Sequence, residues 1–304
     1  MKEGEIVNGQ MSARGRLLTD KTKSSRRHTR SYRNQPLSAF LLCVTVTAIV
    51  ITVGVFLLLI GYILVKGLPH ITLSLFAFEY NSENVSLFPA LVNTLTMTLL
   101  SLLIAVPLGI CSAVYLAEYA KRGNWLVSIV RMTAETLSGI PSIVYGLFGL
   151  LFFVTALGWG YSILAGAFTL SIMILPLIMR TTEEALESVP DTYREASFGL
   201  GAGKLRTVFR VVLPSAVPGI LAGVILAIGR IVGETAALIY TAGTVAGIPG
   251  NLMGSGRTLA IHMYALQSEG MHIEASYATA VVLLIMVVGI NALSGFLARK
   301  IAKG

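Results

Sequence analysis

Long apolar runs alternate with short polar segments along most of this 304-residue chain. Each run has about 20 residues or more, which is enough for a helix to cross the roughly 30 Å hydrocarbon core of a bilayer. The pattern predicts an all-α integral membrane protein. About six transmembrane helices are expected, at 39–65, 90–117, 137–157, 161–181, 212–240 and 275–298.

Basic residues fall almost entirely on one side of these predicted helices. If the N-terminus is cytoplasmic, the inner segments are 1–38, 118–136, 182–211 and 299–304. Together with Arg180 at a helix end they hold 20 of the 23 basic residues, whereas the outer segments 66–89 and 241–274 hold only Lys66 and Arg257. Because cytoplasmic segments of membrane proteins carry an excess of Lys and Arg, both termini are expected to be cytoplasmic and the number of crossings even.

The composition agrees with lipid as the solvent, since 55% of the residues are hydrophobic and only 12% are charged. A net charge of +8 could indicate a nucleic-acid binder, but nine of the basic residues precede Ser38 and most others lie between apolar runs. This distribution fits membrane topology better than a groove for a phosphate backbone, so no nucleic-acid partner is expected. Cys43 and Cys111 lie inside apolar runs and show neither pairing nor metal-ligand spacing.

The segment 1–38 is basic and without periodicity, which predicts a disordered cytoplasmic tail. It is too long for the charged start of a cleaved signal sequence. The tail acts either as an orientation anchor, the interpretation that we favour, or as a contact for anionic lipid. The other predicted parts are a first transmembrane helix (39–65), an outer loop (66–89), a core membrane domain (90–298) and a cytoplasmic C-terminus (299–304).

The cytoplasmic loop 182–211 is the most specific segment of the chain. Ser188-Val189-Pro190-Asp191 is typical of a helix start, and Gly199, Gly201 and Gly203 end the short helix that follows. Leu205, Val208, Phe209 and Val212 then recur at helical spacing and lead to Leu213-Pro214 at the membrane. The pattern predicts a helix–turn–helix on the inner surface that offers a compact knob of small residues to a cytoplasmic partner.

The glycines in this loop do not form a nucleotide site. Gly199-Leu200-Gly201-Ala202-Gly203-Lys204 looks superficially like a phosphate-binding loop, but Phe198 stands where a glycine is needed and Leu205 where Ser or Thr is needed. No cofactor is expected in this chain.

Two ionisable residues, Arg230 and Glu234, lie within the fifth predicted span. A charge near the middle of a bilayer costs roughly 2.5–3.5 kcal/mol on insertion scales, so such residues usually face a polar cavity or a partner. Their i, i+4 spacing allows a structural ion pair. The functional alternative is an arginine that lines an anion pathway and is held by the glutamate. Arg180 is either an anchor at the inner surface or part of the same pathway.

The third predicted helix opens with Glu135-Thr-Leu-Ser138-Gly-Ile-Pro141-Ser142. Proline interrupts a helix and leaves backbone groups without partners. The N-terminal N–H groups of a broken helix can bind an anion, with Ser138 and Ser142 beside them. A packing kink is the competing interpretation.

The cytoplasmic loop resembles the signature of ATP-binding-cassette (ABC) importer permeases, which is Glu-Ala-Ala, three residues, Gly, nine residues, Ile, one residue and Leu-Pro. Ser and Val here replace the second Ala and the Ile. The resemblance implies a type I importer permease fold in which this knob is the coupling helix for the ATPase. The matching residues are Glu195, Ala196, Ser197, Gly201, Val211, Leu213 and Pro214.

Three further stretches resemble the permease subunits of the phosphate-specific transport system, and the Gly233-Glu-Thr-Ala-Ala-Leu238 form is most similar to the A-type subunit. The others are 138–149 and 180–190. The resemblance implies phosphate uptake through a bacterial or archaeal cytoplasmic (inner) membrane by alternating access, with Arg180 and Arg230 matching basic residues implicated in phosphate passage. The implied partners are a related permease, two cytoplasmic ATP-binding subunits, an outer-face phosphate-binding protein and the lipid bilayer.

Three alternatives differ in class. A related permease would carry another oxyanion or small solute. A proton-coupled secondary transporter would work without nucleotide and use Arg230–Glu234 as its relay. An intramembrane enzyme is disfavoured, because the four histidines (His28, His70, His262 and His272) show no close metal-ligand spacing and no catalytic constellation is apparent.

Overall fold

The computed structural model describes residues 36–121 and 123–301. These residues are helical or form turns and loops, and none of them is in a strand. The predicted tail before Pro36 and the last three residues of the predicted C-terminus lie outside the described residues. The chain divides into two compact units, residues 1–62 and 63–304, which are considered separately.

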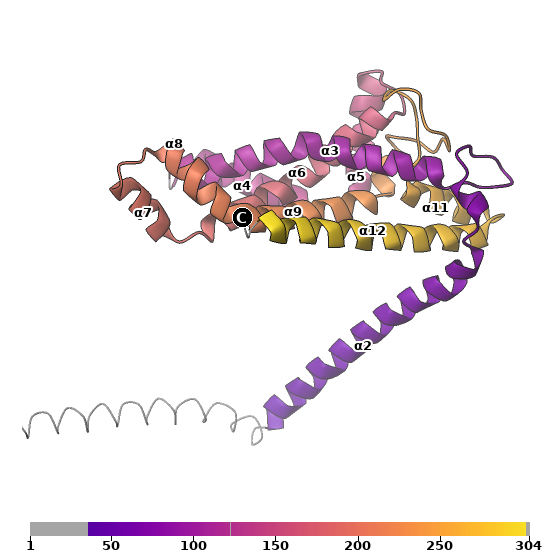
Figure 1. The fold of residues 1–304 in the computed structure, drawn as a ribbon, viewed down its shortest axis with the longest axis horizontal. Helices are drawn as coiled ribbons and strands as arrows, with labels where there is room; N and C mark the ends of the chain where they lie inside the picture. Colours follow the sequence, from indigo (N-terminus) through magenta and orange to yellow (C-terminus); the bar gives the residue numbers. More distant parts are fainter. Residues whose placement is uncertain (1–35, 122, 302–304) are drawn as a thin grey trace, which may run out of the picture. The chain divides into compact units, whose positions relative to one another are not determined.

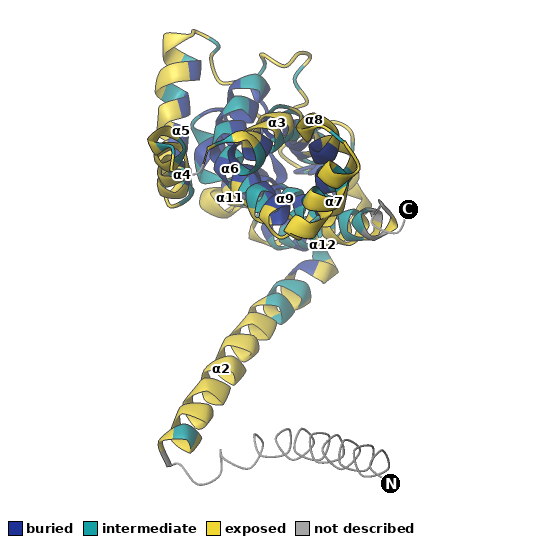
Figure 2. Cartoon of the chain, turned by 90° about the vertical axis from the view of Figure 1, so that its left-hand side faces the viewer, coloured by how far each residue is buried: buried dark blue, intermediate teal, exposed yellow. Residues whose placement is uncertain are grey.

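The described part of the first unit belongs to helix α2 (Pro36–Gly67), whose last turn lies in the second unit. Its large apolar side chains, Phe40 and Phe56 among them, are exposed along the helix, as the yellow colour of α2 in Figure 2 shows. A helix that is apolar on every side is stable only where lipid or protein surrounds it. The first predicted span is therefore confirmed as a helix of membrane-spanning length.

The second unit is a bundle built around α6 (Ile163–Glu187), which packs against α3 (Phe88–Val114) and α9 (Leu213–Val232) (Figure 1). α12 (Ile273–Ile301) packs along α9. The core between α3, α6 and α9 includes the fully buried side chains of Met97, Leu170, Met173, Ile174, Ile178 and Ile231.

Small residues let these helices approach one another closely. A side chain on Gly109 of α3 would place its Cβ 2.7 Å from Ile178 Cγ2 of α6, and one on Gly223 of α9 would overlap Thr181. Close approach at Gly is a common mode of helix packing in lipid, where van der Waals contact replaces the hydrophobic driving force.

The third predicted span is broken, and its boundary was wrong. Instead of one helix over 137–157, α4 (Trp125–Ser138) and α5 (Ser142–Gly149) meet at a bend of 102°, and α5 continues as the π-helical turn η5 (Leu150–Ala156). Pro141 lacks an N–H group and disfavours helical geometry in the residue before it, so the helix ends at Ser138. The predicted inner segment 118–136 is consequently mostly helical.

The fifth predicted span, 212–240, has different ends for a similar reason. The helix begins earlier, as α8 (Lys204–Thr207) and the π-helical turn η6 (Val208–Val212), and runs through α9 to Val232. It stops at Gly233, and a separate short helix, α10 (Ala236–Ile239), follows. Five helices of the described residues are long and apolar enough to cross a membrane, or six if α4 and α5 count as one span.

Other helices extend beyond the predicted apolar windows. α6 continues to Glu187, six residues past the predicted end at 181, and α3 begins at Phe88 and continues as the π-helical turn η4 (Tyr115–Tyr119). Hydropathy marks where a helix leaves hydrocarbon, whereas backbone hydrogen bonding carries the helix on into water.

The predicted outer loops are folded segments. The first contains the 3-10 turns η2 (Leu68–His70) and η3 (Leu73–Phe76), and the second contains α11 (Leu259–Glu269), which packs on α12. One small core joins both segments to α12, and its buried members include Leu75, Val85, Leu87, Leu259, Leu266 and Ala278. Figure 1 shows these segments at the end of the bundle opposite to α8 and to α7 (Asp191–Gly199).

Candidate functional site

The predicted cytoplasmic knob is a helix–turn–helix, as expected, formed by α7 and α8. Ser188 does not cap α7, because its hydroxyl donates to the Ala185 carbonyl of α6 at 2.7 Å, and Pro190 occupies the position before the first turn. At the other end of α7, Gly201 has φ +80°. Gly201 N–H donates to Phe198 O at 2.9 Å and Ala202 N–H to Ser197 O at 3.1 Å. This pair of bonds is a Schellman motif, in which glycine supplies the left-handed residue.

The tip of the knob is apolar and exposed. Leu200, beside Gly201, has 89% of its surface exposed, and four further large side chains of α7, α8 and η6 are also exposed: Tyr193, Phe198, Leu205 and Phe209. Glu195 and Ala196 of the signature are also exposed, whereas Ser197 turns inward and shares a 2.9 Å hydrogen bond with Thr207 of α8. An exposed apolar patch of this kind indicates a protein-binding surface.

The base of the knob is fixed by Arg194, which the sequence did not single out. Its guanidinium contacts Glu118 of η4 through Nη2 at 2.6 Å and Nε at 3.1 Å. It also donates to the carbonyls of Val189 at 2.7 Å and Leu186 at 2.9 Å. The side chains of Arg194 and Glu118 are 16% and 8% exposed. Nη2 and Nε both donate to the same carboxylate oxygen, Glu118 Oε1. A largely buried, charge-assisted contact of this kind has defined geometry, so it fixes α7 against the ends of α3 and α6.

Apolar contacts complete the base. Val114, Leu186, Val208 and Val212 are among the members of one buried cluster that joins the ends of α3 and α6 to η6 and the start of α9. Of the remaining signature residues, Leu213 packs against this cluster, Val211 is half-buried in η6, and Pro214 is exposed in the first turn of α9. The predicted coupling residues thus divide into an exposed tip and a packed base.

A second candidate region lies at the break between α4 and α5. Tyr145 of α5 donates its hydroxyl to the Leu137 carbonyl of α4 at 2.8 Å, which bridges the bend. Ser138 donates to Ala134 O within its own helix at 2.9 Å. Ser142 is the first residue of α5 and is half-buried, and no side chain caps this helix start. The region therefore contains a helix N-terminus whose partial positive charge lacks a side-chain acceptor.

Short helix α10 packs directly against α5. An added Cβ on Gly146 would lie 2.7 Å from the Cα of Ala237, so only glycine permits this approach. Glu234 is buried and accepts a 3.0 Å hydrogen bond from Ala237 N–H, which caps α10. Arg230 is half-buried at the end of α9, near enough for its charge to act on Tyr145.

The structure does not show the contact between Arg230 and Glu234 that their i, i+4 spacing allows. None of the ion pairs between described residues joins them. The i, i+4 argument needs a continuous helix, but α9 ends at Val232 and Glu234 faces the next helix instead. The glutamate therefore organises α10 and leaves the arginine without this counter-charge.

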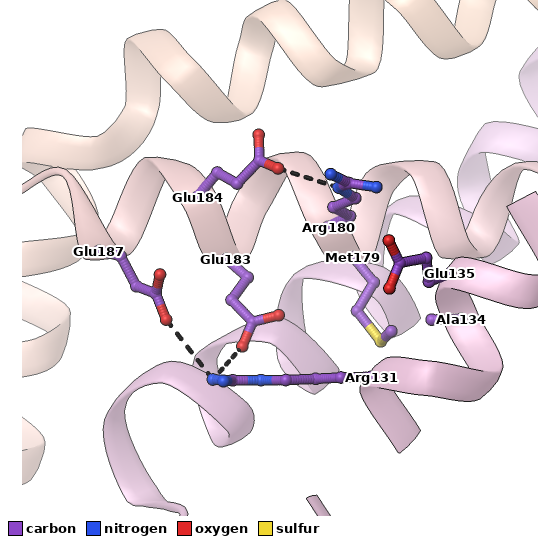
Figure 3. Close-up of a pocket in the computed structure, with 8 residues that line it drawn as sticks. All are labelled: Arg131, Ala134, Glu135, Met179, Arg180, Glu183, Glu184 and Glu187. Carbon is purple, nitrogen blue, oxygen red and sulfur yellow. Dashed lines mark hydrogen bonds and ion pairs between the residues drawn. The ribbon is translucent and has the colours of Figure 1, made fainter. Parts of the chain in front are cut away.

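Arg180 lies in a different setting, a hollow of about 220 Å³ between α4 and α6 (Figure 3). It is 57% exposed and pairs with Glu184 at 2.9 Å. Arg131 pairs there with Glu183 at 2.5 Å and Glu187 at 3.5 Å, and Glu135 also lines the hollow. With two arginines and four glutamates the hollow is acidic, so Arg180 is neutralised in this conformation.

The described helices, with their broken interior segments and an exposed knob at one end, are those of a polytopic membrane protein. Among the described residues, no group of three or more His, Cys, Asp or Glu side chains is placed to hold a metal ion. Residues 105–303 match the family described as "Binding-protein-dependent transport system inner membrane component", and the chain belongs to this family. The family comprises transport components of the inner membrane, which confirms the predicted location.

Sequence relatives agree with the family. The chain is 36% identical over 287 residues to "Probable ABC transporter permease protein YqgI" of Bacillus subtilis, a match that covers 87% of this chain and 94% of that protein. It is 41% identical over 156 residues to "Phosphate transport system permease protein PstA 1" of Mycobacterium tuberculosis, covering 51% of each. It is 36% identical over 207 residues to PstA of Mycobacterium leprae, covering 67% of each. The predicted resemblance to A-type phosphate permeases is confirmed.

Solved structures agree on the fold. A chain of a bacterial ABC transporter involved in the import of alginate superposes with a TM-score of 0.57 at 18% identity, covering 90% of this chain and 99% of that one. A chain of the MetNI methionine ABC transporter gives a TM-score of 0.55 at 22% identity, covering 71% and 94%. These similarities concern the fold alone, and they confirm the predicted ABC importer permease fold.

Proposed function

We propose that this chain forms half of the channel of an ATP-driven importer of inorganic phosphate. The observation that carries the proposal is Arg230, which is half-buried at the end of α9 and belongs to none of the ion pairs between described residues. An arginine inside a membrane domain is costly unless it meets an anion or a polar cavity. Its planar donor fork matches phosphate.

The start of α5 adds to this anion preference. Its uncapped N–H groups carry partial positive charge, and Ser142 is the first residue of the helix. Arg230 of α9 is near enough for its charge to reach Tyr145, which lies one turn further along α5. A phosphate near the break would therefore meet a guanidinium and a helix N-terminus together. The relatives named as phosphate transport permeases support phosphate over other oxyanions.

Arg180 and Ser138 are assigned secondary parts in the pathway. Arg180 would have to release Glu184 before it could bind an anion, and Ser138 would have to release the Ala134 carbonyl. Glu234 contributes by positioning α10 against α5. Because Arg230 belongs to none of the ion pairs between described residues, we expect it to bind the anion before the other two.

Transport would proceed by alternating access driven from the knob. Two cytoplasmic ATP-binding subunits, which would bind ATP and Mg, would close on nucleotide and move the tip of α7. Arg194 and the packed base would pass that movement to α3 and α6. A related second permease would complete the channel, and an outer-face phosphate-binding protein would deliver the substrate.

Substituting Arg230 with glutamine is expected to lower phosphate uptake by about 10- to 100-fold, because hydrogen bonds to a charged group contribute roughly 1.5–3 kcal/mol. Uptake of labelled phosphate by proteoliposomes containing the full complex measures the effect. Arg230→Lys keeps the positive charge but lacks the planar fork of donors, so its phosphate uptake should lie between that of wild type and that of Arg230→Gln. Glu234→Gln keeps an acceptor for Ala237 and should transport nearly normally. Full uptake by Arg230→Gln would remove this residue from the pathway.

The function itself is tested by leaving out components. Proteoliposomes with both permeases, the ATPase subunits and the binding protein should take up phosphate in preference to sulfate and molybdate. Omission of the ATPase should abolish uptake. Uptake that persists without it would favour a proton-coupled secondary transporter, whose proposed Arg230–Glu234 relay lacks a direct contact. Preference for sulfate or molybdate would point to a permease for another oxyanion.

A further inference from the structure

Arg257 is a buried cation in the outer segment that the proposed pathway does not use. Only 4% of its surface is exposed, although it lies directly before α11 at the outer end of the bundle. Its Nε and Nη2 atoms are buried without a hydrogen-bond partner, and none of the ion pairs between described residues includes it. A buried guanidinium without a counter-charge is among the most costly groups that a fold can contain.

The two unpartnered atoms form one edge of the guanidinium. Nε–H and Nη2–H point the same way and are the donors that bind a carboxylate or an oxyanion in a bidentate manner. The ring of Tyr80, from the first outer segment, lies 4.6 Å from Cζ and is half-buried. A π face stabilises a cation but accepts no strong hydrogen bond from this edge.

The backbone around Arg257 is held firmly. Its N–H donates to Val245 O at 2.9 Å, and its carbonyl accepts a 3.2 Å bond from Asn93 Nδ2 of α3. Two residues on, Leu259 N–H donates to Thr94 Oγ1 of the same helix at 2.8 Å. The Arg257 side chain therefore extends from a backbone segment whose position is fixed by these hydrogen bonds.

The neighbouring His262 does not supply a counter-charge. It is fully buried, and its ring makes an edge-on contact with Tyr80 at 6.1 Å between centroids. Burial, and then the charge of Arg257, lower the pKa of His262 to about 3, with the Val85 backbone acting in the opposite direction. The histidine is therefore neutral at physiological pH, and Arg257 is the fixed charge at this place.

We infer that Arg257 forms an anion site at the outer end of the permease, which accepts a small oxyanion when the outer segments separate. In this conformation the site is buried, with the Tyr80 ring over the face of the guanidinium. The site would receive its counter-charge only in the outward-open state, so an arriving anion favours that state over the closed one. A bidentate edge of this size suits a tetrahedral oxyanion such as inorganic phosphate. The inference rests on the proposed function for the choice of phosphate.

The test uses the assembled transporter in nanodiscs without nucleotide or binding protein, titrated with inorganic phosphate and, separately, with sulfate. Wild type is expected to show a thermal unfolding midpoint that rises with phosphate, because a ligand stabilises the state to which it binds. Arg257→Gln should unfold at a higher temperature than wild type when phosphate is absent, and it should lose most of the phosphate-dependent rise. In proteoliposomes that contain the full complex with ATP and the binding protein, the apparent KM of Arg257→Gln for phosphate uptake should be about tenfold higher or more, as for loss of a charged hydrogen-bond donor.

Lys66→Gln is the matched control, since Lys66 is the other basic residue that the sequence places on the outer side and it is exposed. It should leave both readouts unchanged. If Arg257→Gln does not assemble, Arg257→Lys, which lacks the bidentate edge, should show the weakened phosphate response.

Several results would overturn the inference. Arg257→Gln could unfold at a lower temperature with an unchanged phosphate response, which would make Arg257 a structural residue. An effect that requires the binding protein would make it a docking contact instead. If Arg257→Gln takes up phosphate with the kinetics of wild type, this inference is wrong, whereas the proposed phosphate function is unaffected. Stabilisation of wild type but not of Arg257→Gln by sulfate, without phosphate uptake, supports the site and defeats the proposed phosphate function.

Discussion

An Arg194→Ala variant is expected to lose nearly all ATP-driven transport and much of the stability of the cytoplasmic end. The substitution leaves Glu118, which is 8% exposed, as a buried charge without its partner. It also removes the donors to the carbonyls of Leu186 and Val189. Breaking a buried ion pair from one side costs about 3–5 kcal/mol. Phosphate uptake and the thermal unfolding midpoint of the reconstituted complex measure the two effects.

Asp191→Ala provides the matched control for this prediction. Asp191 contacts the same guanidinium at 3.1 Å, but its side chain is 79% exposed. Exposed ion pairs contribute about 0–1 kcal/mol, so this variant should behave nearly as wild type does. A second variant, Glu118→Gln with Arg194→Met, removes both charges and should recover stability without recovering coupled transport. Normal transport by Arg194→Ala would show that α7 moves α3 and α6 through other contacts.

This clamp, the Arg194–Glu118 ion pair, matters because α7 has little other attachment to the bundle. No residue of α7 is buried, and the Ser197–Thr207 hydrogen bond ties it to α8 rather than to the bundle. A force applied at the exposed tip would deform a loosely held loop before it moved a helix. Arg194 makes the base stiff by joining α7 to the ends of two core helices at once. The polar clamp and the apolar cluster beneath it therefore act as one connection.

The knob formed by α7 and α8 could be predicted because the residues that shape it act on the backbone next to them. The sequence indicated a helix end from Gly199, Gly201 and Gly203, and the Schellman motif forms at the middle one of the three. Pro141 likewise indicated a broken helix, and the chain bends by 102° there. In each case a single residue restricts the backbone wherever it occurs, so no knowledge of the fold is needed.

The missed features depend on contacts between distant residues. Glu118 and Arg194 are 76 positions apart, and no spacing rule links them. Arg230 and Glu234 were linked by a spacing rule that presupposed a continuous helix, and the stop at Gly233 removed its premise. Arg257 counted only as one basic residue in an outer loop, because burial cannot be read from a segment of mixed polarity. Local signals thus predicted the knob, whereas the contacts that attach it to the bundle depend on the tertiary fold.

Replacing Gly201 with valine is expected to abolish coupled transport while membrane insertion remains intact. Space is not the obstacle, since an added Cβ would meet nothing within 4 Å. The obstacle is the φ of +80° at this position. This left-handed conformation costs an L-residue about 1–2 kcal/mol, and it costs a β-branched residue more. The strain should open the Schellman motif, turn Leu200 away from its position at the tip and so remove the surface that we propose binds the ATPase.

Gly199→Val is the control for this substitution, because Gly199 is equally open but lies in the last turn of α7 and is not among the positive-φ glycines. Valine is a better helix former than glycine, so this variant should keep its turn. Co-purification of the ATPase with each variant, followed by phosphate uptake, separates loss of docking from loss of transport. Gly201→Val should lose both, and Gly199→Val should retain the ATPase. Equal loss in the two variants would assign the effect to added bulk at the interface, and normal transport by Gly201→Val would show that the left-handed turn is not required for coupling.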